Sequence, residues 1–263
     1  MPKFLRYAPR VGDSLGKSTN FTEVLHPETL AKLPILMYHD ISAESGKGLR
    51  VSVSGFEAHC KHLASNEYTT HHFAEILKPE TSLKGKNCIL TFDDGYVNQL
   101  EFAVPILQKY GLKATFFIPL AYLGKSDAWN EGANPIMTAG QLRSLPSETI
   151  ELAYHSFQHR KYDGLSKEEI EEDSQQCFKV VSEERLDFTK VVAYPYGKFP
   201  RKNPEKKHFF KQLKENGFQL GLRIGNRIEK YPFSNTFELN RIDIKGEWSL
   251  LKFKRKLRIG KLF

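Results

Sequence analysis

The stretch CILTFDDGY, residues 88–96, joins a short apolar run to two consecutive acidic residues and a glycine. The run Cys88–Phe92 predicts a buried strand, because its apolar residues are continuous rather than alternating. Asp93 and Asp94 follow directly, and Gly95 permits a sharp turn at this point. Two adjacent carboxylates are costly to bury without partners, so the strand end predicts either a surface turn or a site that holds a cation.

The same pattern of short apolar runs, separated by amphipathic stretches, recurs along the 263 residues. Further strands are expected at residues 34–38, 114–118, 150–154, 190–194, 219–223 and 238–242. Helices are expected at about residues 55–65, 98–110, 138–145, 167–184 and 203–216, with a last helix at the C-terminus. Strands alternating with helices predict a parallel sheet, either a barrel or a doubly wound sheet, with its chemistry at the carboxyl ends of the strands.

A second polar motif follows another predicted strand end. Residues 155–159 read HSFQH, directly after the strand expected at 150–154. We expect this motif to form a helical turn, on which His155 and His159 face the same side. With Asp94 they would make a two-histidine, one-aspartate set that leaves coordination positions open, as catalytic metal sites do.

These motifs resemble those of the polysaccharide deacetylases (carbohydrate esterase family four, the NodB homology domain). TFDDGY at residues 91–96 is similar to the first family motif, and HSFQH at 155–159 matches the motif H-[ST]-x-x-H. VVAYPYG at residues 191–197 resembles the third motif. The resemblance extends from about residue 33 to 248 and implies a single-domain α/β fold, a distorted (β/α) barrel of about seven parallel strands.

The resemblance also implies a role for each site residue. Asp93 resembles the general base of the family, and the backbone N–H of Tyr196 would stabilise the oxyanion. Asp94, His155 and His159 resemble the ligands of a divalent metal ion, which is usually zinc in this family.

One departure from the family pattern concerns the acid that protonates the departing amine. Many members use a late histidine, but no histidine follows His208 in this chain. MYHDI at residues 37–41 instead resembles the MYHxI motif of the poly-N-acetylglucosamine deacetylases. His39 is therefore the candidate acid, because histidine is a common proton donor near neutral pH; the alternative is a structural histidine at a strand end.

A second departure is that residues 193–195 lack the arginine usual before the proline of the third motif. Arg241 is expected either to orient Asp93 through a charge-assisted hydrogen bond or to form a plain ion pair with Asp243.

Aromatic side chains are the expected substrate contacts. Trp129 and Trp248 can stack on sugar rings, although large aromatic residues more often belong to the core. We assign Tyr96, Tyr194 and Trp248 to substrate binding.

The expected function is metal-dependent hydrolysis of N-acetyl groups, on N-acetylhexosamine units of a glycan or a glycan precursor. Two alternatives are an O-acetyl esterase acting on glycans and a non-catalytic relative that only binds glycan. A non-haem iron oxygenase also uses two histidines and a carboxylate, but that class places an HxD pair on antiparallel strands.

Three regions are expected: an N-terminal extension at residues 1–32, the deacetylase domain at 33–249 and a basic amphipathic tail at 250–263. Between residues 252 and 261 the tail has six Lys or Arg and no acidic residue. We favour a last helix with one packed and one solvated face; the alternative is contact with an anionic membrane surface. Despite a net charge of +8, nucleic acid is not an expected partner, because no nucleic-acid-binding signature is present.

The three cysteines include no CxxC pair, which is typical of a reducing compartment. The N-terminus has no secretory signal pattern, and no stretch approaches the roughly 20 apolar residues of a membrane span. The sequence therefore predicts a cytoplasmic protein, peripheral at the inner membrane face if the tail binds lipid, and a nucleotide-linked or lipid-linked sugar as substrate.

Overall fold

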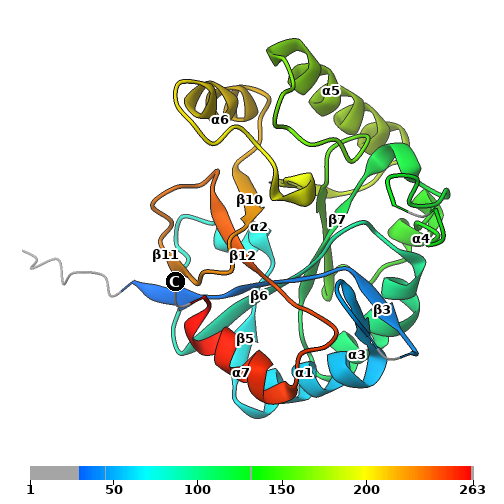
Figure 1. Cartoon of the computed structure of the whole chain (residues 1–263), viewed down its shortest axis with the longest axis vertical. Coiled ribbons are helices and arrows are strands. Elements are labelled where there is room, and N and C mark those ends of the chain that lie inside the picture. The colour runs from blue at the N-terminus through cyan, green and yellow to red at the C-terminus, as the bar shows by residue number, and fades with distance from the viewer. Residues whose placement is uncertain (1–29, 45, 131, 262–263) are drawn as a thin grey trace, which may run out of the picture.

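Seven parallel strands close into a barrel in the computed structural model, which describes residues 30–44, 46–130 and 132–261 (Figure 1). Around the ring the strands are β2 (Ile35–Tyr38), β12 (Leu239–Asp243), β10 (Leu220–Ile224), β9 (Phe188–Ala193), β8 (Ile150–Tyr154), β7 (Ala114–Ile118) and β6 (Lys86–Phe92). Pairing of β6 with β2 closes the ring. The expected barrel of about seven parallel strands is therefore confirmed, and the doubly wound alternative is excluded.

Helices surround the barrel on its outside (Figure 1). They are α1 (Val53–Ser65), α3 (Val104–Lys109), α4 (Ala139–Arg143), α5 (Lys167–Glu183), α6 (Glu205–Glu215) and α7 (Leu250–Ile259). The short helix α2 (Phe73–Ile76) differs, because its buried Phe73 and Ile76 pack with the residues of the barrel interior. Single turns add η2 (Leu120–Tyr122) and η3 (Pro195–Gly197). None of the helices in the described ranges is long and apolar enough to span a membrane.

The helix expected at residues 98–110 is divided into two parts. Its first half is a π-helix, η1 (Gln99–Ala103), and α3 continues from it with Pro105 in its first turn. Proline has no backbone N–H to donate to the preceding turn, and short π-helical turns within helices are frequent at functional sites. The apolar periodicity of the segment carried no sign of this change in helix type.

Short strands that the sequence analysis did not anticipate complete the structure. Strand β1 (Ala31–Leu33) pairs antiparallel with β11 (Glu229–Tyr231), and β3 (Asp40–Ser42) pairs in parallel with β4 (Arg50–Ser52). Strand β5 (Tyr68–Thr70) pairs with the start of β6. Each has three residues, too few for an apolar pattern to be recognised.

Alternate residues of each barrel strand face two different apolar environments. In β6, Leu90 packs with helix residues such as Phe56 in the layer between strands and helices. Its neighbour Ile89 packs with Ile35 and Phe117 in the interior of the barrel. Because both faces of a strand are covered, its residues are apolar without alternation, which is why the strands could be predicted from continuous apolar runs.

Helix α7 packs on the barrel domain rather than forming a separate tail. Phe253 and Leu257 are buried, and the Phe253 ring stacks on His59 of α1 with 3.8 Å between ring centroids. The helix thus has the packed face that we favoured.

At the N-terminal end of the chain, strand β1 spans the boundary that was expected at residue 32. Residues 1–29 of the expected N-terminal extension lie outside the described residues.

The buried His59 predicts a loss of stability in acid. Burial, together with the nearby His62, lowers the pKa of His59 to about 4, below its unfolded value of about 6.5. The neutral ring therefore stabilises the fold above pH 6.5, and this contribution of about 2–3 kcal/mol is lost as the pH falls toward 4. His59→Gln should show a correspondingly smaller fall in unfolding free energy between pH 7.5 and 4.5, measured by urea denaturation. The exposed His208→Gln variant serves as the control; equal pH dependence of the two variants would contradict this role.

Candidate active site

The polar motifs meet at one end of the barrel, because each follows the carboxyl end of a strand. Parallel strands bring these ends together although they lie far apart in the sequence. Here the site residues are His39 after β2, Asp93 and Asp94 after β6, His155 and His159 after β8, Tyr196 after β9 and Arg241 in β12.

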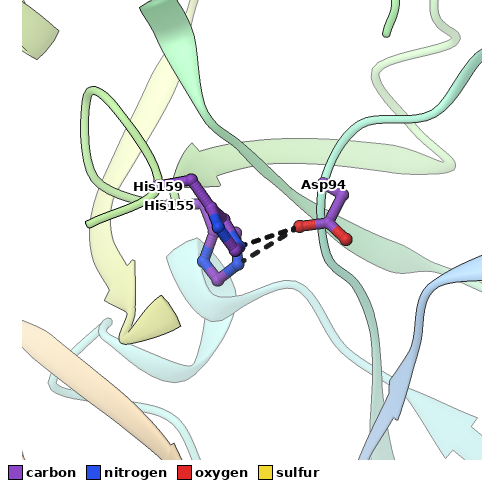
Figure 2. Close-up of side chains that lie close together, drawn as sticks. All are labelled: Asp94, His155 and His159. Atoms are coloured by element: carbon purple, nitrogen blue, oxygen red, sulfur yellow. Dashed lines mark ion pairs between the residues drawn. The ribbon is translucent and has the colours of Figure 1, made fainter. Parts of the chain in front are cut away.

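Asp94, His155 and His159 point toward one another (Figure 2). Their nearest ligand atoms all lie within 4.8 Å of one another, and all three residues are buried. Asp94 Oδ1 is 3.5 Å from His155 Nε2 and 3.2 Å from His159 Nε2. Such a group can share one ion and still leave coordination positions open.

Several properties of these side chains fit a divalent cation. Asp94 Oδ1 and His159 Nδ1 are buried and have no hydrogen-bond partner among the described residues. His155 Nδ1 lies 2.8 Å from the carbonyl oxygen of Ala193; if it donates to that oxygen, Nε2 is left as the ligand atom. Burial, only partly offset by the charge of Asp93, lowers the pKa of His155 to about 4, so its imidazole is neutral at pH 7, as metal binding requires.

The loop that carries the two histidines is not the expected helical turn. Residues 155–160 have no helical assignment, and Ser156 and His159 adopt left-handed backbone conformations with φ of 55° and 54°. Asp173 of α5 holds this loop by accepting hydrogen bonds from the Phe157 N–H at 2.8 Å and the Tyr162 hydroxyl at 3.0 Å. The expectation of a helix was therefore wrong, and the rings converge because tertiary contacts shape the loop.

Asp93 and Arg241 form a buried, two-pronged ion pair. Arg241 Nη1 and Nη2 donate to the two carboxylate oxygens of Asp93 at 2.5 and 2.7 Å. Of the two arrangements considered for Arg241, the structure has the first, because Asp243 pairs instead with Lys245 at 2.6 Å. Burial alone would raise the pKa of Asp93, but the Arg241 guanidinium and the neighbouring histidines hold that pKa well below its usual range.

His39 and Gln99 lie beside this pair. His39 Nε2 is 3.7 Å from Asp93 Oδ2. Gln99, the first residue of the π-helix, is fully buried and donates from Nε2 to the carbonyl oxygens of both His39 (2.8 Å) and Asp93 (2.6 Å). It therefore ties together the ends of β2 and β6. Sequence reasoning missed Gln99, since a glutamine in a predicted helix carries no sign of such contacts.

A cleft of about 380 Å³ opens over the candidate site, and its lining includes Asp94, His155 and His159 together with His39, Asp93 and Arg241. The Trp129 ring stacks on His159 with 4.2 Å between centroids, and the half-exposed Tyr196 ring meets the same imidazole in a T-shaped contact with 4.8 Å between centroids. Both rings line the cleft, so Trp129 rather than Trp248 is the tryptophan at the site.

The three residues assigned to substrate binding occupy different environments. Tyr96 lines the cleft, and its hydroxyl donates to Asp127 at 3.1 Å. Tyr194 also belongs to the cleft lining, but its ring is fully buried and its hydroxyl donates to the carbonyl oxygen of Phe237. Trp248 packs against the core with Lys252 above its ring and does not line the cleft. Tyr194 thus borders the cleft from the core, whereas Trp248 lies outside the cleft lining, away from the position expected for a substrate contact.

Comparisons with known proteins agree with the motifs. A family model described as polysaccharide deacetylase matches residues 80–221, more than half of the chain. The curated Bacillus subtilis (strain 168) protein YxkH, named as a polysaccharide deacetylase, is 33% identical over 198 residues, or 74% of this chain. The chain spans 65% of the length of that relative.

Solved structures share the fold at lower identity. The Streptococcus pyogenes deacetylase PplD, solved with acetate, is 22% identical with a TM-score of 0.72, covering 87% of this chain and 99% of that chain. A de-N-acetylase from Aggregatibacter actinomycetemcomitans is 18% identical with a TM-score of 0.71, covering 86% of this chain and all of that chain (100%). These two likenesses concern the fold alone. The family match, together with the strand-end motifs that it contains, shows that this chain belongs to the polysaccharide deacetylase family.

Proposed function

We propose that this protein removes N-acetyl groups from N-acetylhexosamine units of a glycan, using a divalent ion, zinc, held by Asp94, His155 and His159. One observation carries the proposal: three buried ligand atoms converge while the carboxylate of Asp93 stays beside them, with its Oδ2 atom 3.8 Å from His155 Nε2. Nitrogen and oxygen ligands in a three-residue set are the pattern of catalytic zinc. When bound, the ion would polarise the acetyl carbonyl group and lower the pKa of a water molecule at the site.

Asp93 is the residue in position to accept the proton of the attacking water. Its low pKa keeps the carboxylate ionised at neutral pH, and Arg241 fixes the plane of the carboxylate through both oxygen atoms. Each oxygen retains a second lone pair, so the guanidinium orients the base without using up its capacity to accept a proton.

His39 is the proposed acid, and the backbone N–H of Tyr196 is the proposed oxyanion donor. His39 lines the cleft on the Asp93 side, 3.7 Å from Asp93 Oδ2, and can pass a proton to the departing nitrogen. Tyr196 lies at the rim with a left-handed backbone (φ 56°), directly before Gly197, at which a Cβ atom would lie 2.9 Å from the backbone nitrogen of Ile224. The turn after β9 thus holds the Tyr196 backbone at the cleft.

An amine is a poor leaving group unless it is protonated, so a cleft that holds an acid favours an N-acetyl over an O-acetyl substrate. The name of the Aggregatibacter relative, a de-N-acetylase, points the same way. The direct test is acetate release from N-acetylglucosamine pentamers and from O-acetylated xylan oligomers, with zinc and with a chelator. Zinc-dependent release from the pentamer alone supports the proposal, whereas release from xylan alone indicates the O-acetyl esterase.

Removing one proposed ligand should abolish metal binding. Asp94→Asn replaces a charged ligand by a neutral one, and we expect zinc affinity to fall at least 100-fold in titration calorimetry. Excess zinc should raise the melting temperature of the unaltered protein but not of the variant, because only a ligand that binds the folded state stabilises it. Asp163→Asn, at an exposed aspartate outside the cluster, should retain both effects. Unchanged zinc affinity in Asp94→Asn would contradict the metal site.

Base and metal functions should be separable. Asp93→Asn should retain zinc binding but lose about 10²–10⁴-fold in acetate release, the usual contribution of a positioned base.

Arg241→Lys keeps a positive charge but cannot hold both oxygen atoms, so turnover should fall. It should also raise the pKa of Asp93 and move the acidic limb of the kcat/KM profile to higher pH. A purely structural Arg241 would leave that limb in place.

Gln99 is expected to act as a positioning residue for His39 and Asp93. Gln99→Met is similar in size but donates no hydrogen bond, so the two strand ends lose their link. We expect kcat to fall at least tenfold, with a smaller change in KM and a shifted pH profile. Gln99→Asn, a shorter amide, should recover part of the rate. A change in melting temperature without a change in kcat or pH profile would show that Gln99 only stabilises the fold.

A further inference from the structure

Most of the exposed large hydrophobic side chains of the described residues gather at two places. Leu49 and Tyr196 line the catalytic cleft. The second group lies on helix α7 and comprises Leu250, Leu251 and Ile259, of which Leu251 is 78% exposed. The cleft accounts for the first group, but the proposed reaction makes no use of the second.

Exposed apolar and basic residues form one stripe along α7. Its inner face holds the buried Phe253 and Leu257. Leu251, Arg255 and Ile259 follow at intervals of four residues and are exposed, so they lie on one side of the helix, away from the core. The helix therefore presents a second, outward apolar row in addition to the row that packs on the barrel.

A surface groove of about 640 Å³ runs along this outer side. Its described lining contains no acidic residue and consists of Ser249, Leu251, Lys252, Lys254, Arg255, Arg258 and Ile259. The cations surround the two aliphatic side chains, and long basic side chains can cover apolar surface with their stems while their charges reach outward. Exposed apolar side chains ringed by cations match the surface of an anionic lipid bilayer, which has an acyl boundary beneath its phosphates.

The positive charge extends to the neighbouring elements. The pKa of His62 of α1 is lowered, first by its partial burial and then by the positive charges of Lys254 of α7 and Lys86 of β6. These two lysines therefore lie close to the same histidine. At the start of the helix, the half-buried Trp248 has the Lys252 ammonium 5.1 Å from its ring centroid. A tryptophan beside basic residues is common at the interface between membrane and water.

Other occupants fit this face less well. A polyanion without apolar groups would pair with the cations but leave Leu251 and Ile259 in water. Residues 1–29 of this chain contain four Lys or Arg and three Asp or Glu, so that segment offers no net negative charge to match the groove. We propose that the outer face of α7 is a peripheral docking surface for an anionic lipid bilayer, with Leu251 and Ile259 at the acyl boundary and the basic side chains on the phosphates.

The proposal is tested by flotation of the full chain with vesicles of phosphatidylcholine alone or with 30% phosphatidylglycerol. The unaltered protein should bind the acidic vesicles at least tenfold more tightly than the neutral ones. Leu251→Ser/Ile259→Ser and Arg255→Glu/Arg258→Glu should each weaken that binding at least tenfold. The matched control is Lys207→Glu/Lys214→Glu on α6, which makes the same change in net charge at exposed lysines and should bind as the unaltered protein does. Circular dichroism melting verifies that each variant is folded.

Three outcomes would overturn the proposal. The first is equal binding of the unaltered protein to both kinds of vesicle. The second is a Leu251→Ser/Ile259→Ser variant that binds as well as the unaltered protein, which would indicate a site for polyanions; heparin would then bind with the same dependence on Arg255 and Arg258. The third is an equal loss in the α6 control, which would show that only net charge matters. Acetate release plays no part in this test, so its outcome is independent of the proposed function.

Discussion

The structure of the site depends on how two buried carboxylates at the end of β6 are neutralised. Asp93 and Asp94 are adjacent in the chain and are exposed by only 2% and 4%. Burying charge without a partner is costly, so each needs its own positive counterpart. Asp93 has Arg241, which binds both of its oxygen atoms. Asp94 faces two imidazoles instead, and His155 is neutral at pH 7. No lysine or arginine of the described residues pairs with Asp94 as Arg241 pairs with Asp93, which is the physical reason for proposing a divalent ion there.

The different partners also suit the two aspartates to the separate roles proposed for them. A carboxylate held by a planar guanidinium is fixed in orientation and stays ionised, as a base must be. A carboxylate with a free oxygen that faces two imidazoles is suited to bind metal. This division is enforced by the backbone, because Asp94 has φ of 74° and therefore turns away from the direction of the strand. Gly95 follows with φ of 65°, and a Cβ atom there would lie 2.7 Å from Ile118 Cδ1.

Support from outside the cluster keeps the site in place. Gln99 links the carbonyl groups of His39 and Asp93, and Asp173 holds the loop between His155 and His159. Neither residue lines the cleft: Gln99 acts through the backbone carbonyl groups of His39 and Asp93, and Asp173 acts through the loop that carries the two histidines. The outer face of α7 lies on the far side of that helix from the core, and it shares no lining residue with the cleft. Catalysis and surface attachment would therefore use separate parts of the fold.

The amino-acid sequence by itself determined the order of the barrel strands and main helices, because strands buried on both faces leave continuous apolar runs. It also indicated that Asp93, Asp94, His155 and His159 meet at one site, since motifs that follow parallel strands must lie at one end of the sheet. Closure of the barrel, however, depends on the pairing of β2 with β6, and the partner of Arg241 lies 148 positions away in the chain. Likewise, only packing decided that Trp129 covers His159 while the Tyr194 ring is buried in the core. Local patterns record whether a residue is buried, whereas the identity of its neighbours arises from contacts between distant segments, which no local pattern contains.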